Sequence, residues 1–140
     1  MSPTPTAGQF RKASASSPQQ ACVMVFRDEH RTLLWDDKLA DPAGTSDTPV
    51  PPEQCLTLNH DQFEAVQAAI RAGTPVRRFL TIIRKADGHY LFGASPQDRS
   101  SIGTAELCFD HAEYTAFVHA VCQHEFDQRQ HETIRRSLQM

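Results

Sequence analysis

Short apolar runs separated by polar turns occur twice along the chain. Each occurrence has the form of two strands joined by a tight turn, and the two lie 57 residues apart: Val23–Arg27 with Leu33–Trp35, and Leu80–Arg84 with Tyr90–Phe92. The second turn contains the pair Asp87-Gly88, which favours hairpin turns with positive φ. The pattern therefore predicts two β-hairpins.

A third strand and a helix are predicted after each hairpin. Shifting the chain by 51 residues lays Leu56–His60 over Leu107–His111, and apolar residues at helical spacing follow both segments. The two shifts differ by six residues, which predicts an insertion in the first copy within Asp41–Pro52, a stretch rich in Pro, Gly and Thr. Loops tolerate such insertions at a small entropic cost.

Both predicted helices begin with a capping box. Asn59 lies three residues before Gln62, and Asp110 lies three residues before Glu113. In this motif the first side chain accepts a hydrogen bond from the first turn, and the Gln or Glu side chain reaches back to the cap. The sequence therefore assigns these four residues a structural role as helix caps.

The predicted fold class is α+β, with two pseudo-repeated β-β-β-α units that form one compact body. The units span residues 21–73 and 74–127, and about 50 residues give only a marginal core when a unit stands alone. Residues 1–20 are predicted to be a mostly disordered tail, although Phe10 can still dock. Residues 128–140 are predicted to form a C-terminal helical extension.

Composition narrows the classes of protein that the chain can be. It has 140 residues and a formal net charge of −3, and no apolar run approaches the roughly 20 residues that cross a bilayer. A cytoplasmic protein is therefore predicted. The four cysteines are scattered within apolar patterns, which indicates reduced thiols. The weakly acidic balance argues against direct nucleic-acid binding.

Histidine and cysteine side chains raise the question of metal or thiol chemistry. His119 and Cys122 share a helix face and could be two zinc ligands, but no second pair at ligand spacing lies nearby. Cys108 could pair with His111 as nucleophile and base, yet no third group to orient them can be named. Glycine-rich phosphate loops are absent from the sequence. We therefore predict no metal, cofactor or catalytic residue, and a metal-dependent or thiol enzyme stays as the alternative.

Two groups of side chains are candidates for binding a protein partner. Trp35, Asp36 and Asp37 form an aromatic and acidic strand end, which we interpret as an exposed edge. Phe126 and Ile134 belong to the predicted tail helix. Core packing is the competing role for Trp35 and Phe126, and a solvated strand end that discourages edge pairing is the competing role for the two aspartates.

Several short segments resemble one protein family in their order and spacing. They are Phe10-Arg-Lys-Ala-Ser14, Cys22-Val-Met-Val25, Leu34-Trp-Asp-Asp-Lys38 with Asp41-Pro42, and Phe117-Val with Val121 and Glu125-Phe-Asp127. On these segments the chain resembles the bacterial domain-of-unknown-function family 397. The resemblance covers residues 9–73 as one degenerate copy and 78–127 as a second.

The resemblance implies a role in regulation. Members of this family are commonly encoded beside helix-turn-helix repressors and are thought to bind and modulate them, in an antitoxin-like or developmental role. We therefore expect a non-enzymatic regulatory protein whose partner is a helix-turn-helix regulator, and a homodimer is compatible with this expectation. Direct nucleic-acid binding remains a further alternative, and its candidate residues are Arg77, Arg78, Arg84 and Lys85.

Overall fold

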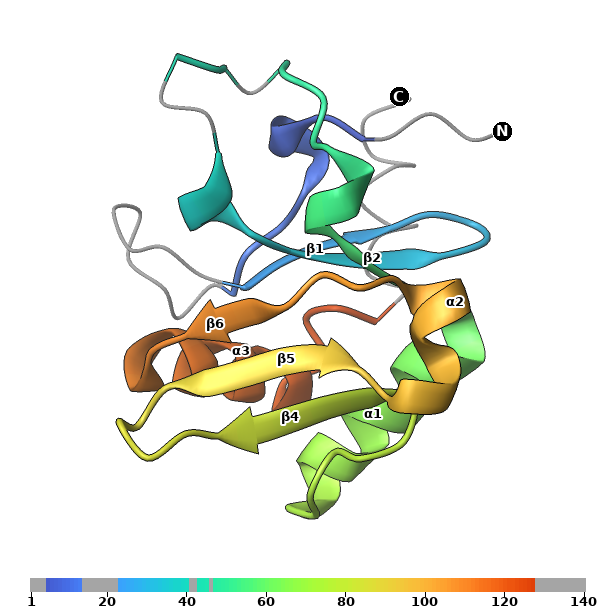
Figure 1. Ribbon diagram of the computed structural model, residues 1–140, viewed down its shortest axis with the longest axis vertical. Helices are drawn as coiled ribbons and strands as arrows, with labels where there is room; N and C mark the ends of the chain where they lie inside the picture. Colours follow the sequence, from blue (N-terminus) through green and yellow to red (C-terminus); the bar gives the residue numbers. More distant parts are fainter. Residues whose placement is uncertain (1–4, 14–22, 41–42, 46, 128–140) are drawn as a thin grey trace.

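The computed structural model describes residues 5–13, 23–40, 43–45 and 47–127, which form an α+β protein with two three-stranded antiparallel sheets (Figure 1). The first sheet contains β1 (Val23–Arg27), β2 (Thr32–Asp36) and β3 (Leu56–Leu58). The second sheet contains β4 (Leu80–Arg84), β5 (Tyr90–Ala94) and β6 (Leu107–Phe109). The α-helices of the described residues are α1 (His60–Ala72), α2 (Arg99–Ile102) and α3 (His111–Cys122). Short 3₁₀ helices span Ala7–Gln9, Asp37–Leu39, Pro52–Gln54 and Pro96–Asp98.

Strands pair in the same order in the two sheets, β1-β2-β3 and β4-β5-β6. Leu34 lies in the middle strand of the first sheet, between its partners on β1 and β3, and Phe92 lies between its partners on β4 and β6. Both side chains are fully buried. The middle strand of each sheet therefore contributes one side chain to the centre of the protein.

The two hairpin turns differ in length by one residue. Residues 28–31 connect β1 to β2, whereas residues 85–89 connect β4 to β5 and include Gly88 at a φ of 89°. The uniform shift of 57 residues is therefore wrong for the middle strands, because the longer second turn moves β5 along by one position. By its place in the ladder, Trp35 corresponds to Gly93 and not to Phe92.

Asn59 and Asp110 cap α1 and α3 with the same pair of hydrogen bonds. Asn59 Oδ1 accepts from the backbone N–H of Gln62 at 2.8 Å, and Gln62 Oε1 accepts from the backbone N–H of Asn59 at 2.9 Å. Asp110 Oδ1 accepts from Glu113 at 2.7 Å, and Glu113 Oε1 accepts from Asp110 at 2.9 Å. These bonds satisfy N–H groups that have no partner inside the first helical turn. Gly73 ends α1 in the left-handed conformation, at a φ of 72°.

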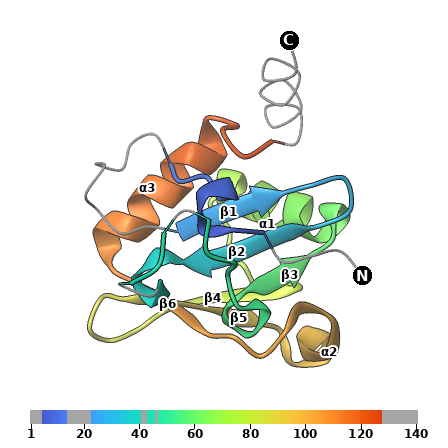
Figure 2. The same ribbon diagram turned by 90° about the horizontal axis from the view of Figure 1, so that it is seen from above.

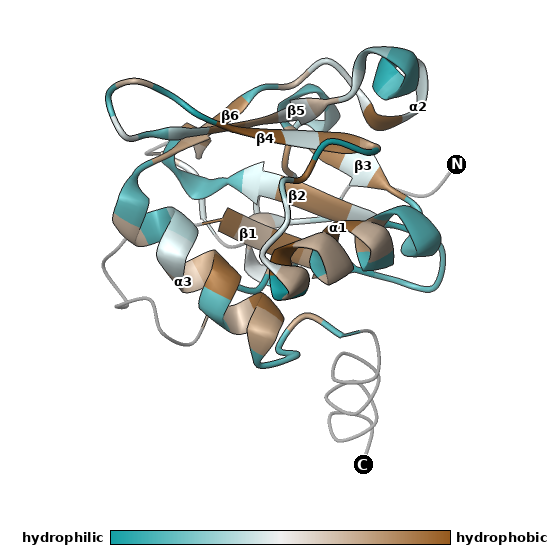
Figure 3. Ribbon diagram, turned by 90° about the horizontal axis from the view of Figure 1, so that it is seen from below, coloured by the Kyte–Doolittle hydropathy of each residue, from teal (hydrophilic) through white to brown (hydrophobic). Residues whose placement is uncertain are grey.

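A single hydrophobic cluster joins the inward faces of both sheets to α1 and α3. Within it the Phe92 ring meets Phe109 at 5.0 Å and Phe117 at 5.7 Å between centroids, in edge-to-face geometry. The apolar colouring in Figure 3 follows the strands and these two helices. Figures 2 and 3 show α1 and α3 on the same side of the molecule, with the second sheet on the opposite side. Because both sheets contribute to this cluster, each half of the described chain buries its apolar face against the other.

Residues 5–13 pack against the outer face of the first sheet. Arg11 pairs with Val25 through backbone hydrogen bonds of 2.7 and 2.8 Å, and Phe10 is only 6% exposed. A second hydrophobic cluster forms there from Phe10, Leu33, Trp35, Val50 and Cys55. The prediction of a disordered tail is therefore wrong for residues 5–13, because the aromatic ring of Phe10 and the strand edge of β1 hold this segment in place.

Polar contacts also join the two halves. The buried Arg27 donates from Nη1 to the carbonyl oxygen of Phe126 at 2.9 Å, and Arg71 on α1 donates from Nε to the carbonyl oxygen of Val121 at 2.9 Å. Lys38 Nζ lies 2.6 Å from Glu113 Oε2. Each contact satisfies a charged or carbonyl group that would otherwise lose hydrogen bonds on burial.

The end of the chain is described only as far as Asp127. The predicted helical extension over 128–140, which includes Ile134, lies outside the described residues. Among the described residues, no helix has both the length and the apolar character needed to cross a membrane.

Candidate functional site

Two segments that are far apart in the sequence meet beside the first sheet. One is the N-terminal segment, residues 5–13, and the other is the connection from β2 to β3, which spans residues 37–55, against 95–106 for the connection from β5 to β6. Ala7 N–H donates to the Thr48 carbonyl oxygen at 3.0 Å, and Val50 N–H donates to the Pro5 carbonyl oxygen at 3.0 Å. The two segments are therefore tied together by backbone bonds.

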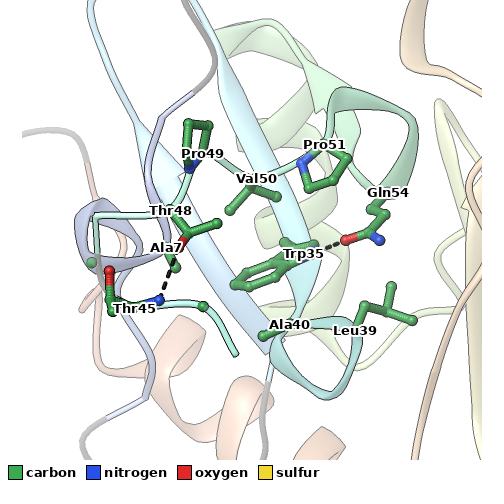
Figure 4. Close-up of a pocket in the computed structure, with 12 residues that line it drawn as sticks. Ala7, Trp35, Leu39, Ala40, Thr45, Thr48, Pro49, Val50, Pro51 and Gln54 are labelled. Carbon is green, nitrogen blue, oxygen red and sulfur yellow. Dashed lines mark hydrogen bonds between the residues drawn. The ribbon is translucent and has the colours of Figure 1, made fainter. Parts of the chain in front are cut away.

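A hollow of about 600 Å³ lies between these segments and β2. Figure 4 shows the indole of Trp35 with lining side chains from both segments around it. The residues that line the hollow are Ala7, Gly8, Trp35, Leu39, Ala40, Gly44, Thr45, Thr48, Pro49, Val50, Pro51 and Gln54.

Trp35 forms a rigid wall of the hollow. Its side chain is 2% exposed, and its Nε1 donates to Gln54 Oε1 at 3.0 Å (Figure 4). The Phe10 ring lies 5.4 Å from the Trp35 ring between centroids and 5.8 Å from that of Phe26. The aromatic neighbour and the hydrogen bond fix the indole beneath the hollow, where little of its surface is open to solvent.

The polar groups around the hollow are few. Thr48 Oγ1 accepts from the Thr45 N–H at 2.8 Å, which holds the loop, and Gln54 Nε2 has no partner among the described residues. None of the twelve lining residues carries an ionisable side chain. The hollow can therefore bind an apolar group and accept or donate a small number of hydrogen bonds, and the described part of its lining supplies no ionisable side chain for acid–base chemistry.

Trp35 and Asp36 do not form an exposed edge, which corrects the interpretation from the sequence. Both are buried because β2 is a middle strand, covered on one face by Phe10 and on the other by the shared core. Asp36 Oδ1 lies 3.1 Å from Lys38 Nζ. Asp37 begins a 3₁₀ helix and is half-buried.

Phe126 is fully buried, so it is not an exposed contact residue either. Its ring stacks on that of Phe117 at 5.8 Å between centroids. The core packing weighed as its competing role accounts for this placement. The remaining candidate, Ile134, lies outside the described residues.

The side chains considered for metal or thiol chemistry are dispersed. His119 and Cys122 are exposed on α3, Cys108 is half-buried on β6, and His111 is exposed at the start of α3. Within residues 5–13, 23–40, 43–45 and 47–127, no three His, Cys, Asp or Glu side chains are grouped to hold a metal ion.

Four basic residues considered for nucleic-acid binding are all exposed, at opposite ends of β4. Arg77 and Arg78 precede the strand, and the Arg78 guanidinium lies 4.8 Å from the Phe79 ring centroid. Arg84 ends β4, and Lys85 begins the following turn.

Most of the residues that line the hollow were not identified from the sequence. Only Trp35 was named, because the connection between β2 and β3 was interpreted as a tolerated insertion. One signal was present: Val50 is an apolar residue between Pro49 and Pro51, and such a residue has a reason to be buried within a loop of otherwise small and polar side chains.

The described residues form an α+β protein with an apolar hollow, which two loop segments enclose over one sheet. Comparison of the chain with models of protein families, with curated proteins and with solved structures finds no match. The site geometry therefore provides the basis for a functional proposal.

Proposed function

We propose that this protein is a non-enzymatic regulator that acts by binding another protein, and that the hollow beside Trp35 receives an apolar side chain of that partner. The hollow is the observation that carries the proposal. About 600 Å³ is within the size range of ligand sites, and its wall is fixed by Phe10 and by the hydrogen bond from Trp35 to Gln54. A preformed apolar hollow lowers the entropic cost of binding.

The expected partner is a helix-turn-helix regulator, since this is what the resemblance to the domain-of-unknown-function family 397 implies. The net charge of −3 favours encounter with a basic DNA-binding protein. The proposal includes an antitoxin-like or developmental role and a cytoplasmic location, where such a partner binds DNA.

The proposal also includes an origin of the fold by duplication of a β-β-β-α unit. Three features support it: the same strand order in both sheets, the same capping box before α1 and α3, and the matching places of Leu34 and Phe92. In this interpretation the N-terminal segment and the longer β2–β3 connection are additions that give the first copy its hollow.

Binding of the regulator is tested by mixing the purified chain with the helix-turn-helix protein encoded nearest to it and measuring co-elution and affinity. Leu39 lines the hollow and is 45% exposed, so Leu39→Asp adds a charge to the apolar lining with little effect on folding. We expect this variant to weaken binding at least about tenfold, which corresponds to about 1.4 kcal/mol.

Ile83→Asp is the matched control, because Ile83 is an aliphatic side chain of similar exposure, 54%, on the second sheet. It should retain the wild-type affinity for the regulator. Absence of a complex with the wild-type chain would overturn the proposed partner. Equal losses in the two variants would overturn the hollow as the binding site.

A further inference from the structure

Gln54 carries the one side-chain amide among the described residues that line the hollow. It ends the 3₁₀ helix Pro52–Gln54, and its backbone N–H donates to the Pro51 carbonyl oxygen at 3.0 Å. Pro51 and Pro52 have restricted φ angles, so the backbone before this side chain has little freedom. Local structure therefore sets the position of the half-buried Gln54 side chain at the hollow.

The hydrogen bond with Trp35 fixes the orientation of the Gln54 amide. An indole N–H can only donate, so the end of the amide that it meets is the oxygen. Trp35 Nε1 donates to Gln54 Oε1 at 3.0 Å. The indole is itself held in place, because it is 2% exposed and its ring lies 5.4 Å from that of Phe10 between centroids. Turning the amide round would place an NH₂ group against the indole N–H and lose this bond.

This orientation leaves Gln54 Nε2 as a donor at the hollow. The nitrogen carries two N–H groups and has no partner among the described residues. Figure 4 shows it on the side of the amide away from the indole. Leu39, which also lines the hollow, is 45% exposed, so the hollow is open to solvent at this residue. In the free protein, solvent can reach the half-buried amide.

The two hydroxyl groups of the lining have another task. Thr48 Oγ1 accepts from the Thr45 N–H at 2.8 Å, and Thr45 Oγ1 accepts from the Asp47 N–H at 3.3 Å, so both oxygens hold the loop. Figure 4 shows both threonines on the other side of the indole from Gln54. The amide of Gln54 is therefore the donor that an occupant meets on its own side of the hollow.

An occupant of the hollow has to satisfy this donor. The lining is otherwise mainly apolar, which favours an apolar occupant. A buried N–H group left without an acceptor costs more free energy than its hydrogen bond contributes when made. A site that carries such a donor therefore discriminates against occupants that lack the acceptor.

We propose that Gln54 is the specificity-determining residue of the hollow, and that the hollow selects an apolar group joined directly to a carbonyl, whose oxygen accepts from Nε2. This rests on the proposed function, because it specifies the group that the partner inserts. In a protein partner the group is an apolar residue whose own backbone carbonyl is free. Carbonyl groups inside a helix are bonded to the following turn, whereas those of the last turn are not. The inserted residue therefore belongs to a helix end or an extended segment.

Acetophenone and α-methylstyrene test this selection without the partner. The two molecules have nearly the same shape, but only acetophenone has a carbonyl acceptor. Trp35 is the only tryptophan of the chain, so its indole N–H gives a single signal in proton–nitrogen correlation NMR that reports binding at the hollow. Titration gives the Kd of each probe, and the ratio of the two Kd values measures the selection. In the wild type, acetophenone should also shift the NH₂ signals of Gln54 more than α-methylstyrene does.

Gln54→Glu removes the donor and keeps an oxygen for the indole N–H. The ratio of the Kd values should move against acetophenone at least about fivefold in this variant. Gln97→Glu is the matched control, because it adds the same charge at an exposed position of the 3₁₀ helix Pro96–Asp98. Its ratio should stay within about twofold of wild type.

The proposal is overturned if acetophenone does not bind, if the two probes shift the Gln54 NH₂ signals equally, or if Gln54→Glu leaves the ratio unchanged. Failure of the proposed function gives a different result: the probes show the expected selection, but the helix-turn-helix regulator forms no complex. A complex with the regulator whose affinity Gln54→Glu leaves unchanged would keep the proposed function and overturn the selection by Gln54.

Discussion

Lys38 lies where carboxylates from the two halves of the protein meet, and its removal tests how the halves are held together. Its Nζ lies 2.6 Å from Glu113 Oε2 and 3.1 Å from Asp36 Oδ1. The two carboxylate side chains are 5% and 6% exposed, whereas Lys38 is 43% exposed. Substitution Lys38→Met keeps the length of the side chain and leaves two buried negative charges without their cation.

The expected loss of stability follows from these exposures. Breaking a buried ion pair costs about 3–5 kcal/mol because a charge is left uncompensated, and an exposed pair is worth about 1 kcal/mol or less. The lysine is screened by solvent but both partners are buried, so we expect an intermediate loss of about 2–3 kcal/mol. For a chain of 140 residues this corresponds to a fall in Tm of roughly 8–12 °C.

Lys85→Met is the matched control for this measurement. Lys85 is 45% exposed, almost the same as Lys38, but its partner Asp87 is 57% exposed and 3.9 Å away. The control should change the free energy of unfolding by less than about 0.5 kcal/mol. Urea unfolding followed by circular dichroism measures both variants, and equal losses in the two would refute the role of carboxylate burial.

The pH dependence gives a second measurement of the same contact. Desolvation lowers the pKa of Lys38, but hydrogen bonds and charge from Glu113 and Asp36 outweigh it, so the pKa is raised above its ordinary value of 10.5. A raised lysine pKa stabilises the fold fully below the ordinary value, and this contribution is lost as the pH rises through the raised pKa. The difference in stability between wild type and Lys38→Met should therefore shrink in strong alkali.

Three further predictions test the core, a helix end and the thiols. Phe126→Ala should lower the free energy of unfolding by about 3–5 kcal/mol, because the ring is fully buried; a loss below about 1 kcal/mol in urea unfolding would contradict this burial. Gly73→Ala should cost about 1 kcal/mol in the same assay, since φ is 72° there, and an unchanged midpoint would contradict that conformation. Desolvation by burial raises the pKa of the Cys55 thiol to about 12, so iodoacetamide should label the exposed Cys122 long before Cys55 in the native protein; mass spectrometry showing equal rates would refute the burial.

Local patterns predicted the elements of this fold because the physics behind them is local. The two capping boxes depend on side chains three residues apart, and the apolar stripe of a helix depends on spacing along one segment. The predicted exposure of Trp35 and Asp36 was wrong because burial depends on what pairs with β2 and on what covers its faces. The paired strand β3 and the covering residues 5–13 both lie far from β2 along the chain.

The hollow also forms through contacts between residues that are far apart in the sequence. Its wall at Trp35 could be named as a candidate, since a lone tryptophan is conspicuous in the sequence. Its other walls form only when Ala7 meets Thr48 and Val50 meets Pro5, through bonds between backbone groups that carry no side-chain signature. Pairing of this kind is decided by the packing of Phe10 on the sheet, and the sequence alone predicted no more than that Phe10 can dock.

The predicted alignment of the two halves was wrong by one residue in the middle strands, so it did not reveal the exposed outer face of the second sheet. Under the uniform shift of 57 residues, Trp35 aligned with Phe92, so the two halves appeared to carry an aromatic residue at the same place. A slip of one residue in a strand moves every side chain to the opposite face of the sheet. The longer turn at residues 85–89 causes that slip: Phe92 points into the shared core, and Gly93 takes the outward place. Since Gly93 shares this outer face with Ile83 and Leu91, Gly93→Trp should bury its indole against them and lower the exposure of both.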